Sequence, residues 1–538
     1  MKQLKRSFLL LLMLVASVLF IAACGGSDDE PTDETTPEEE AGEETTGSEG
    51  GDLIIAIPSE AVSLDPQGSN DTPSSTVAYN IYEALVMQDE NLELQPGLAT
   101  EWDRVDDTTW EFTLREGVTF HDGTEFNADV VQKNFERILD EAVASPRSFL
   151  YDMITEIIVV DEYTVQFVTE YPFAPLAAHL AHNGGGIISS DLIDEDYAAM
   201  EAGENPGSVI SANPVGTGPF TFDYWNSGDS IGLARNDNYW GEPAKLDTVT
   251  FRVVPEESTR LADLETGAIH ISDQLRPSSI SRIENMDGFH VNDEPSVAIN
   301  YIGFNAQKEP FDNKLVRQAI SMAINKEGII DGIYEGTGRP AISPVAPEVY
   351  GYADDVEGLG YDVDEAIALL EEAGYPDGFS TTIWTNDNPD RVDMAVYVQN
   401  ELEAIGIDVT VEEVEWGAFL ENTAAGEHEM FILGWTTVTG DADYGLYPLF
   451  HSENFGQAGN RTFFATDELD DVLVQARREA DEETRLGLYR DVQEILVDEA
   501  PMLYINHTSY LLAVSDAVQG LWQSPTGIHI LKDVTLAQ

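Results

Sequence analysis

The pattern of apolar and polar positions divides the chain into three parts. An unbroken apolar run extends from Phe8 to Ile21. Residues 25–50 then contain no aromatic and no large aliphatic side chain. From Leu53 onward, alternating and helically spaced apolar positions continue to the C-terminus. This succession predicts a leader, a spacer and a large folded body.

The first half of the body mixes strands and helices. Residues 53–57 form a continuous apolar run that is typical of a buried strand, and residues 109–114 alternate as a half-buried strand does. Ser75 is placed to cap a helix whose apolar residues recur every four positions as far as Leu85. Further predictions are a helix from about Asn127 and a strand at 163–167.

The second half contains a predicted parallel βαβ unit. Residues 381–385 and 407–411 are typical of strands, and a helix from about 391 to 404 separates them. Such short links favour parallel pairing. The other predicted elements are helices after Asp312 and Asp364 (the latter closed by Gly374), a strand at 430–435, helices near 467–478 and 482–498, and a strand at 502–506. The pattern indicates a mixed α/β fold with sheets in more than one lobe, since 538 residues exceed what one core usually holds.

The N-terminus has the features of a secretory signal peptide. Lys2, Lys5 and Arg6 precede the apolar run, which is shorter than the roughly 20 residues that a membrane-spanning helix needs. Residues 1–23 are therefore expected to be removed. The segment Ile21-Ala22-Ala23-Cys24 resembles the lipobox of bacterial lipoproteins, which implies that Cys24 is lipidated with palmitate-type acyl chains. The alternative is an ordinary cleavage near Ala23 with an incidental cysteine.

Residues 24–50 are expected to form a disordered acidic tether after the lipidated cysteine, because they cannot bury enough apolar surface to offset the entropy of ordering. Like charges extend such a segment. The mature protein would lie on the extracellular face of the cytoplasmic membrane, which is the periplasmic side in a Gram-negative cell.

The composition argues against nucleic acid as a partner and against chemistry that depends on cysteine pairs. With 100 acidic and 26 basic residues, the formal net charge is −74, which makes nucleic acid a poor partner. Self-repulsion of this size indicates a halophilic or alkaliphilic source, since molar salt shortens the Debye length to roughly 3 Å. The single cysteine excludes an internal disulfide and thiolate metal sites.

Several blocks of the body resemble one family in order along the chain. They are Glu101-Trp102, residues 110–115, Phe120-His121-Asp122-Gly123, residues 216–220, residues 235–240, Phe304-Asn305 with Pro310-Phe311, and residues 316–320. The chain is similar to the bacterial extracellular solute-binding proteins of the peptide, oligopeptide and nickel class (family 5), which serve ABC importers. Two stretches look most similar to the glutathione-binding branch: Leu64-Asp65-Pro66 with Asn70-Asp71-Thr72, and residues 434–450.

The resemblance implies the two-lobed periplasmic-binding-protein fold of type II, the Venus-flytrap arrangement, with an extra subdomain in lobe one. Lobe one would take in residues 51–305, with the inserted subdomain at about 86–210, and the return at 504–538. Lobe two would span 306–503. The chain would cross between the lobes near Phe304-Asn305 and near Tyr504–Asn506. A ligand would bind between the lobes, and closure would bury it.

Candidate ligand contacts follow from the same resemblance. Peptide binders of this class place an aspartate where this chain has Val438, so Asp441 or Asp443 is expected to pair with a ligand ammonium instead. The alternative is that these two are solvated loop carboxylates. Arg391 is expected to bind a ligand carboxylate, with a surface ion pair as the alternative. The remaining candidates are Asp71, Thr72, Tyr79, Trp384, Trp435, Thr439 and Gly440; for the two tryptophans the alternative is core packing.

The expected function is non-enzymatic capture of a short peptide or peptide-like solute, glutathione-like or a di- or oligopeptide. The partners would be an ABC permease and ATPase, and the protein is expected to be a monomer without cofactor or metal. A nickel or metal-chelate binder of the same fold is the alternative, although His179 and His182 lack an evident third ligand. A secreted hydrolase is disfavoured because no Gly-x-Ser-x-Gly or His-Glu-x-x-His motif is present. A further alternative is a lipoprotein that binds a solute, signals through a receptor and delivers nothing to a permease.

The acidic composition predicts that salt stabilises the protein. We expect the melting temperature of the mature protein to rise when sodium chloride is raised from millimolar to molar concentration, because screening relieves self-repulsion. Circular dichroism during heating measures this shift. Equal melting temperatures at low and molar salt would remove the argument for a saline habitat.

Overall fold

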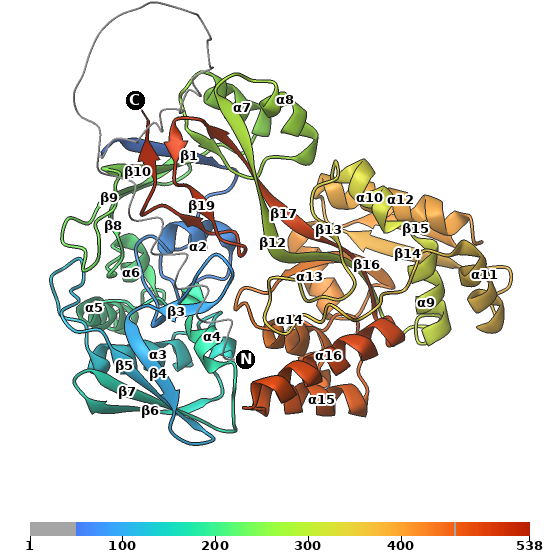
Figure 1. The fold of residues 1–538 in the computed structure, drawn as a ribbon, viewed down its shortest axis with the longest axis horizontal. Coiled ribbons are helices and arrows are strands. Elements are labelled where there is room, and N and C mark those ends of the chain that lie inside the picture. The colour runs from blue at the N-terminus through green and yellow to red at the C-terminus, as the bar shows by residue number, and fades with distance from the viewer. Residues whose placement is uncertain (1–49, 457–458, 538) are drawn as a thin grey trace, which may run out of the picture. The chain divides into compact units, whose positions relative to one another are not determined.

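The computed structural model describes residues 50–456 and 459–537. The predicted signal peptide, Cys24 and the tether up to residue 49 lie outside the described residues. Within the described part, the chain forms a mixed α/β fold with one long sheet and a smaller four-stranded sheet (Figure 1). The buried apolar residues form several separate hydrophobic cores. This agrees with the expectation of a mixed α/β fold with more than one core.

The largest sheet of the described residues has eleven strands and passes through both lobes. Its order is β15-β14-β16-β12-β17-β11-β1-β10-β9-β8, and β13 pairs with β17 beside this path. The strands are β1 (Asp52–Ile57), β8 (Phe220–Asn226), β9 (Ser230–Arg235), β10 (Thr248–Val253), β11 (Ile271–Ser272), β12 (Phe289–Phe304), β13 (Arg339–Pro340), β14 (Ser380–Thr385), β15 (Asp408–Glu413), β16 (Met430–Thr436) and β17 (Met502–Ser515).

Strands β12 and β17 are an antiparallel pair that both lobes share, and they run between the two halves in Figure 1. Asn292 pairs with Leu512 toward the lobe-one end of the two strands, and Tyr301 pairs with Tyr504 toward the lobe-two end. The pairing is interrupted between Pro295 and Ile299. This irregularity lies before the crossing expected at Phe304-Asn305, in the middle of the strands.

Lobe one contains a second sheet within the expected inserted region. It has the order β4-β5-β7-β6, and helix α3 packs on it. Phe112, Phe135 and Phe167 meet edge to face in its core, with ring centroids 5.6 and 5.0 Å apart. The elements are β4 (Ala99–Arg104), β5 (Thr109–Leu114), β6 (Ile154–Asp161), β7 (Thr164–Thr169), α3 (Ala128–Leu139), α4 (Leu176–Leu180), α5 (Ser190–Glu201) and α6 (Ser208–Ala212). The alternating strands predicted at 109–114 and 163–167 are confirmed.

Shorter elements complete lobe one. They are the strands β2 (Val86–Gln88), β3 (Leu94–Pro96), β18 (Val518–Gln519), β19 (Trp522–Gln523), β20 (His529–Ile530) and β21 (Thr535–Leu536), the helices α2 (Thr72–Ala78), α7 (Glu257–Glu265) and α8 (Ile280–Glu284), and the 3-10 turns Ser148–Leu150, Asn183–Gly185 and Pro277–Ser279. The C-terminal residues Val518, Leu531 and Val534 pack in the same core as β1.

Lobe two contains the predicted βαβ unit. β14 and β15 pair in parallel, with Ser380 opposite Asp408, and α12 connects them. This confirms the prediction from the short links. The helices of this lobe are α9 (Lys314–Ala323), α10 (Lys326–Ile333), α11 (Val363–Glu372), α12 (Pro389–Glu403), α13 (Trp416–Ala424), α14 (Ala442–Phe450), α15 (Asp467–Arg478) and α16 (Glu482–Glu499), with a 3-10 turn at Ser452–Asn454.

Some predicted helix starts are wrong by a few residues. Ser75 lies inside α2, and the cap is Asp71, whose side chain accepts a hydrogen bond from the Ser74 amide. Pro73 explains the difference, because a proline in the first turn needs no hydrogen-bond acceptor for its nitrogen. In the same way Asp362, and not Asp364, caps α11. Each time an earlier Asx residue takes the capping position.

A buried ion cluster joins three segments of lobe one. Nη2 of Arg137 lies 2.7 Å from Asp65 Oδ2 and 3.1 Å from Asp196 Oδ2, and the three side chains are 1% exposed. Nη1 of Arg137 also donates to the Gln67 side chain over 2.6 Å. One guanidinium on α3 therefore neutralises carboxylates from the segment after β1 and from α5.

Removing this guanidinium is expected to destabilise the fold. Arg137→Ala leaves two buried carboxylates without their counter-charge, and such a change costs about 3–5 kcal/mol of unfolding free energy. Urea denaturation measures the loss. The matched control is Arg490→Ala, whose ion pairs with Asp355 and Glu494 are exposed and contribute at most about 1 kcal/mol. Equal losses for the two variants would contradict the importance of the buried cluster.

Candidate functional site

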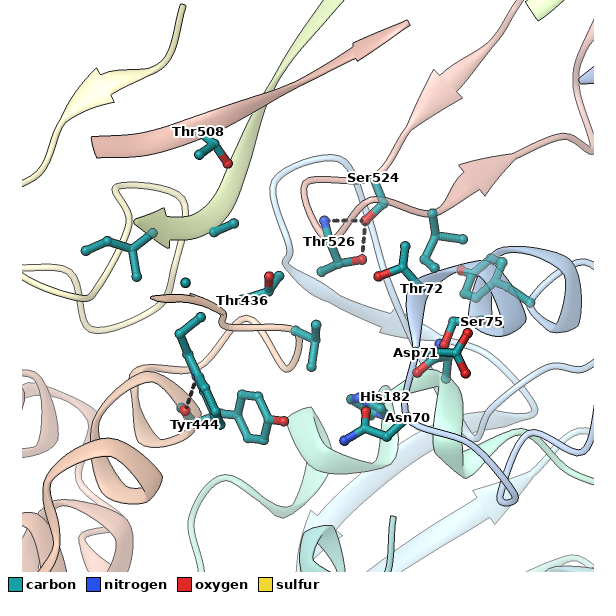
Figure 2. Close-up of a pocket in the computed structure, with 18 of the residues that line it drawn as sticks. Asn70, Asp71, Thr72, Ser75, His182, Thr436, Tyr444, Thr508, Ser524 and Thr526 are labelled. Atoms are coloured by element: carbon teal, nitrogen blue, oxygen red, sulfur yellow. Dashed lines mark hydrogen bonds between the residues drawn. The ribbon is translucent and has the colours of Figure 1, made fainter. Parts of the chain in front are cut away.

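A cavity of about 590 Å³ is lined by residues of both lobes. Lobe one supplies the start of α2, Arg147 and His182, and lobe two supplies the end of β16, Arg391 and Arg461. Figure 2 shows Asp71, Thr72 and Ser75 on the opposite side of this space from Thr436 and Tyr444. The volume is in the range that small-molecule sites in proteins occupy.

The lobes touch one another beside the cavity. The Gln88 side chain donates to the Thr439 carbonyl over 2.6 Å, and the amide of Ala174 donates to the Arg477 carbonyl over 2.9 Å. Arg276 of lobe one and Asp390 of α12 form an ion pair of 3.0 Å. These contacts define a closed arrangement of the described lobes.

The shared strands contribute the part of the cavity next to the interruption in their pairing. Ala298, Ile299 and Asn300 of β12 line it, as does Thr508 of β17. The Ser296 hydroxyl donates to the Thr508 carbonyl over 2.8 Å, in place of regular strand pairing. The place where the chain passes between lobes is therefore also a wall of the site.

The charged lining is mostly cationic. Arg147, Arg391 and Arg461 line the cavity, and within the described part of the chain Asp71 is the one acidic residue that does so. Burial lowers the pKa of all three guanidinium groups from the ordinary value, because desolvation disfavours the charged form. They stay charged at neutral pH, since arginine titrates far above it.

Aromatic rings and small hydroxyls complete the lining. The Trp435 indole nitrogen donates to the Tyr444 carbonyl over 2.9 Å, and the two rings lie 5.3 Å apart. Burial raises the pKa of Tyr79 to about 12, so its hydroxyl is a hydrogen-bonding group and not an anion. From the C-terminal segment, Ser524 and Thr526 hydrogen-bond one another over 2.9 Å (Figure 2).

Half of the predicted site residues line this cavity. Those that do are Asp71, Thr72, Tyr79, Arg391 and Trp435. The others lie elsewhere: Trp384, Thr439, Gly440, Asp441 and Asp443. Trp384 packs beside the ring of His428 in lobe two, 6.5 Å between centroids, which agrees with the alternative of core packing.

Asp441 and Asp443 do not line the cavity, so its lining gives no support to the expectation that one of them meets a ligand ammonium. Asp441 caps α14, and its carboxylate accepts from Arg485 (2.7 Å) and from the Tyr489 hydroxyl (2.8 Å). Asp443 accepts from Arg477 over 3.1 Å. Because α14 begins at this point, both side chains turn toward α15 and α16. Neither is a solvated loop carboxylate, since they are 4% and 2% exposed.

The ion pair with Arg477 explains why the Asp443 carboxyl stays ionised although it is buried. Burial alone would raise the pKa of its carboxyl, but the Arg477 guanidinium and His179 hold it well below its usual range. His179 Nε2 of lobe one lies 3.7 Å from Asp443 Oδ2 of lobe two. The charge of Asp443 therefore contributes to contact between the lobes.

The sequence reasoning missed Arg147 and Arg461. The one sequence feature that could have pointed to them is the small number of basic residues, since the chain has 26 basic residues against 100 acidic ones. The expected position of the family aspartate, Val438, does line the cavity. His182 also lines it, next to Arg147 at 3.1 Å, and burial lowers its pKa well below the ordinary value.

Two features are absent from the described residues, a metal-binding side-chain cluster and a membrane-spanning helix. Residues 50–456 and 459–537 contain no group of three or more histidine, cysteine, aspartate or glutamate side chains arranged to hold a metal ion. Among the helices of the same residues, none combines the length and the apolar character that crossing a bilayer requires.

Comparisons with known proteins agree with the geometry. The family model described as bacterial extracellular solute-binding proteins, family 5 Middle, matches residues 93–457. The glutathione-binding protein GsiB of Shigella dysenteriae is 34% identical over 495 residues, covering 90% of this chain and 94% of that protein. The dipeptide-binding protein of Escherichia coli is 33% identical over 467 residues, covering 82% and 86%.

Solved structures give the same result for the fold. The periplasmic binding protein DppA of Helicobacter pylori, in complex with the peptide STSA, superposes with a TM-score of 0.79 at 34% identity, covering 91% of this chain and 99% of that one. HbpA2 of Haemophilus parasuis superposes with a TM-score of 0.80 at 28% identity, covering 91% and 100%. The expected two-lobed periplasmic-binding-protein fold is thereby confirmed. On these matches, the chain belongs to the bacterial extracellular solute-binding proteins of family 5.

Proposed function

We propose that this protein is the lipid-anchored substrate-binding component of an ABC importer, which captures a short peptide or peptide-like solute and delivers it to a permease. The observation that carries the proposal is a solute-sized cavity lined by both lobes in a member of this family. Relatives named for glutathione and for dipeptides support a peptide-like solute. The features of residues 1–24 support secretion and anchoring.

In this proposal the solute is held by groups from both lobes. Arg391 and Trp435 would contact it from lobe two, and Asp71, Thr72 and Tyr79 would contact it from lobe one. A solute that touches both sides stabilises the closed arrangement relative to an open one, because those contacts exist together in the closed form alone. The contacts between Arg276 and Asp390 and between Gln88 and Thr439 would break on opening.

The rival functions have less support. The relatives are solute-binding proteins, which argues against the hydrolase reading. For a metal-chelate solute the cavity offers His182, but its ring already contacts Arg147 and the Gly184 amide. Such a solute would have to bind through its chelator.

The proposal predicts saturable binding of a peptide-like solute without turnover. Trp416, Trp435 and Trp522 line the cavity, so binding is expected to change tryptophan fluorescence. Titration with glutathione, dipeptides, tetrapeptides and nickel–histidine identifies the class. Arg391→Gln is expected to weaken the affinity about 10- to 100-fold, since a charge-assisted hydrogen bond contributes about 1.5–3 kcal/mol.

Arg490→Gln is the control for this titration, because Arg490 lies in an exposed ion-pair group on α16 and does not line the cavity. Its affinity should match that of the unaltered protein. A lack of response to every peptide would overturn the proposed solute, and cleavage products in the incubated peptides would favour the hydrolase.

Anchoring is tested separately through Cys24. Cys24→Ser removes the thiol that the lipobox-like segment would present for lipidation, so the protein is expected to move from the membrane fraction to the soluble fraction of the cell envelope or medium. Fractionation with immunoblotting measures this. Retention of the variant on the membrane would contradict lipid anchoring through Cys24.

A further inference from the structure

The three arginines of the cavity differ from most other arginines of the described residues. Arg137, Arg317, Arg477 and Arg485 each have a carboxylate oxygen within 3.3 Å. By contrast, Arg147, Arg391 and Arg461 form no ion pair within the described residues. Arg260, which is buried outside the cavity, also lacks a carboxylate partner, but its guanidinium donates to the carbonyls of Val254, Pro255 and Gln274. What distinguishes the three arginines is that they line the cavity without an ion pair.

Arg147 is the most buried of the three, at 4% exposed. Its side chain donates to the Ser69 carbonyl over 2.6 Å and to the Ser75 hydroxyl over 3.1 Å, and it lies 3.1 Å from His182. These hydrogen-bond partners are neutral, because burial keeps His182 uncharged. Asp71 acts on Arg147 electrostatically but forms no ion pair with it. A buried charge without an ion-pair partner is costly, and structures retain one where something else compensates it.

Arg391 and Arg461 both line the cavity from lobe two. Each makes a single side-chain hydrogen bond within the described residues, Arg391 to Asn386 over 3.1 Å and Arg461 to Thr423 over 3.2 Å. Both side chains line the cavity, Arg391 from the start of α12 and Arg461 from the segment before α15. A guanidinium has five N–H donors, so most of their donors remain for a ligand.

The backbone beside Arg391 is also open to a ligand. Gly434 of β16 has no side chain, and a Cβ there would lie 3.3 Å from Arg391 Nη2 and 3.0 Å from the Ile299 carbonyl. Any larger residue would crowd the guanidinium. The glycine therefore leaves Arg391 accessible from the cavity.

The opposite charge is scarce in the lining. Asp71 is the one carboxylate there, and one of its oxygens already accepts from the Ser74 amide. Val438 is apolar, and Asp441 and Asp443 are neutralised elsewhere. Three guanidinium groups against one carboxylate leave two positive charges of the cavity uncompensated.

We propose that the solute is a small peptide-like dicarboxylate with a net negative charge, one carboxylate held between Arg391 and Arg461 and the other by Arg147. This rests on the proposed function, since it requires the solute to lie between the lobes. A zwitterionic dipeptide carries a single carboxylate and leaves one of the two arginine positions without a partner. Because Arg147 belongs to lobe one and the other two belong to lobe two, a dicarboxylate also connects the lobes.

The test compares ligands that differ in charge and little in shape. Isothermal titration calorimetry of the mature protein uses alanyl-glutamate against alanyl-glutamine, glutathione against its glycine monoethyl ester, and glutarate as a dicarboxylate without a peptide bond. We expect the more acidic member of each peptide pair to bind at least about tenfold more tightly, as one charge-assisted hydrogen bond implies.

Substitutions of the arginines test whether these residues cause the preference for the acidic ligand. Arg147→Gln and Arg461→Gln are each expected to reduce the acidic-over-neutral preference to within about threefold. Arg147→Lys keeps the charge, so it should lower the affinity and retain the preference. Arg490→Gln is the control for an arginine outside the cavity. Melting temperatures measured alongside show which variants are folded, and Arg461→Gln serves if Arg147→Gln does not fold.

The outcomes separate this inference from the proposed function. Equal affinities for acidic and neutral peptides, or a preference that persists in both glutamine variants, overturn the dicarboxylate proposal and leave peptide capture standing. Binding of glutarate but of no peptide supports the anionic site and overturns the peptide solute. Binding of none of these compounds overturns both.

Discussion

The antiparallel pair of β12 and β17 is the constraint on which the two-lobed structure depends. These strands carry the sheet from lobe one into lobe two, so the lobes are not joined by loose linkers. Their regular pairing fails between Pro295 and Ile299, and the residues that follow line the cavity. A bend of the strands at this interruption would move one lobe relative to the other and would change the shape of the site at the same time.

The cavity lining carries more positive than negative side chains, whereas the chain as a whole is strongly negative. The surface carries most of a large negative charge, which would repel an anionic solute at low salt. At high salt the repulsion is screened over a few ångström, so charges next to the cavity would act on a solute more strongly than distant surface charges. In buried ion pairs such as that of Arg485 with Asp441, the guanidinium is neutralised by a carboxylate of the protein. Arg391 and Arg461 instead line the cavity. The same residue type thus stabilises the fold in one place and lines the proposed solute site in another.

Local patterns predict the elements better than they predict the site. The alternation in β5 and the short links around α12 follow from packing on one face, so periodicity alone identifies them. The direction of a side chain in a loop depends on distant partners: Asp441 meets Arg485, which is 44 residues away, and no local pattern encodes that contact. Arg147 enters the cavity for the same reason, through segments far apart in the sequence.

The loop between β16 and α14, together with the first residues of α14, contacts both the cavity and the other lobe. Val438 lines the cavity, the Thr439 carbonyl accepts from Gln88 of lobe one, and Asp443 lies beside His179 of lobe one. One short segment therefore lines the cavity and also contacts the other lobe. Because its acids are already held by arginines of α15 and α16, the loop has little freedom to rearrange, and the solute has to fit the loop. An apolar residue at Val438 gives a ligand ammonium no counter-charge at this place in the lining.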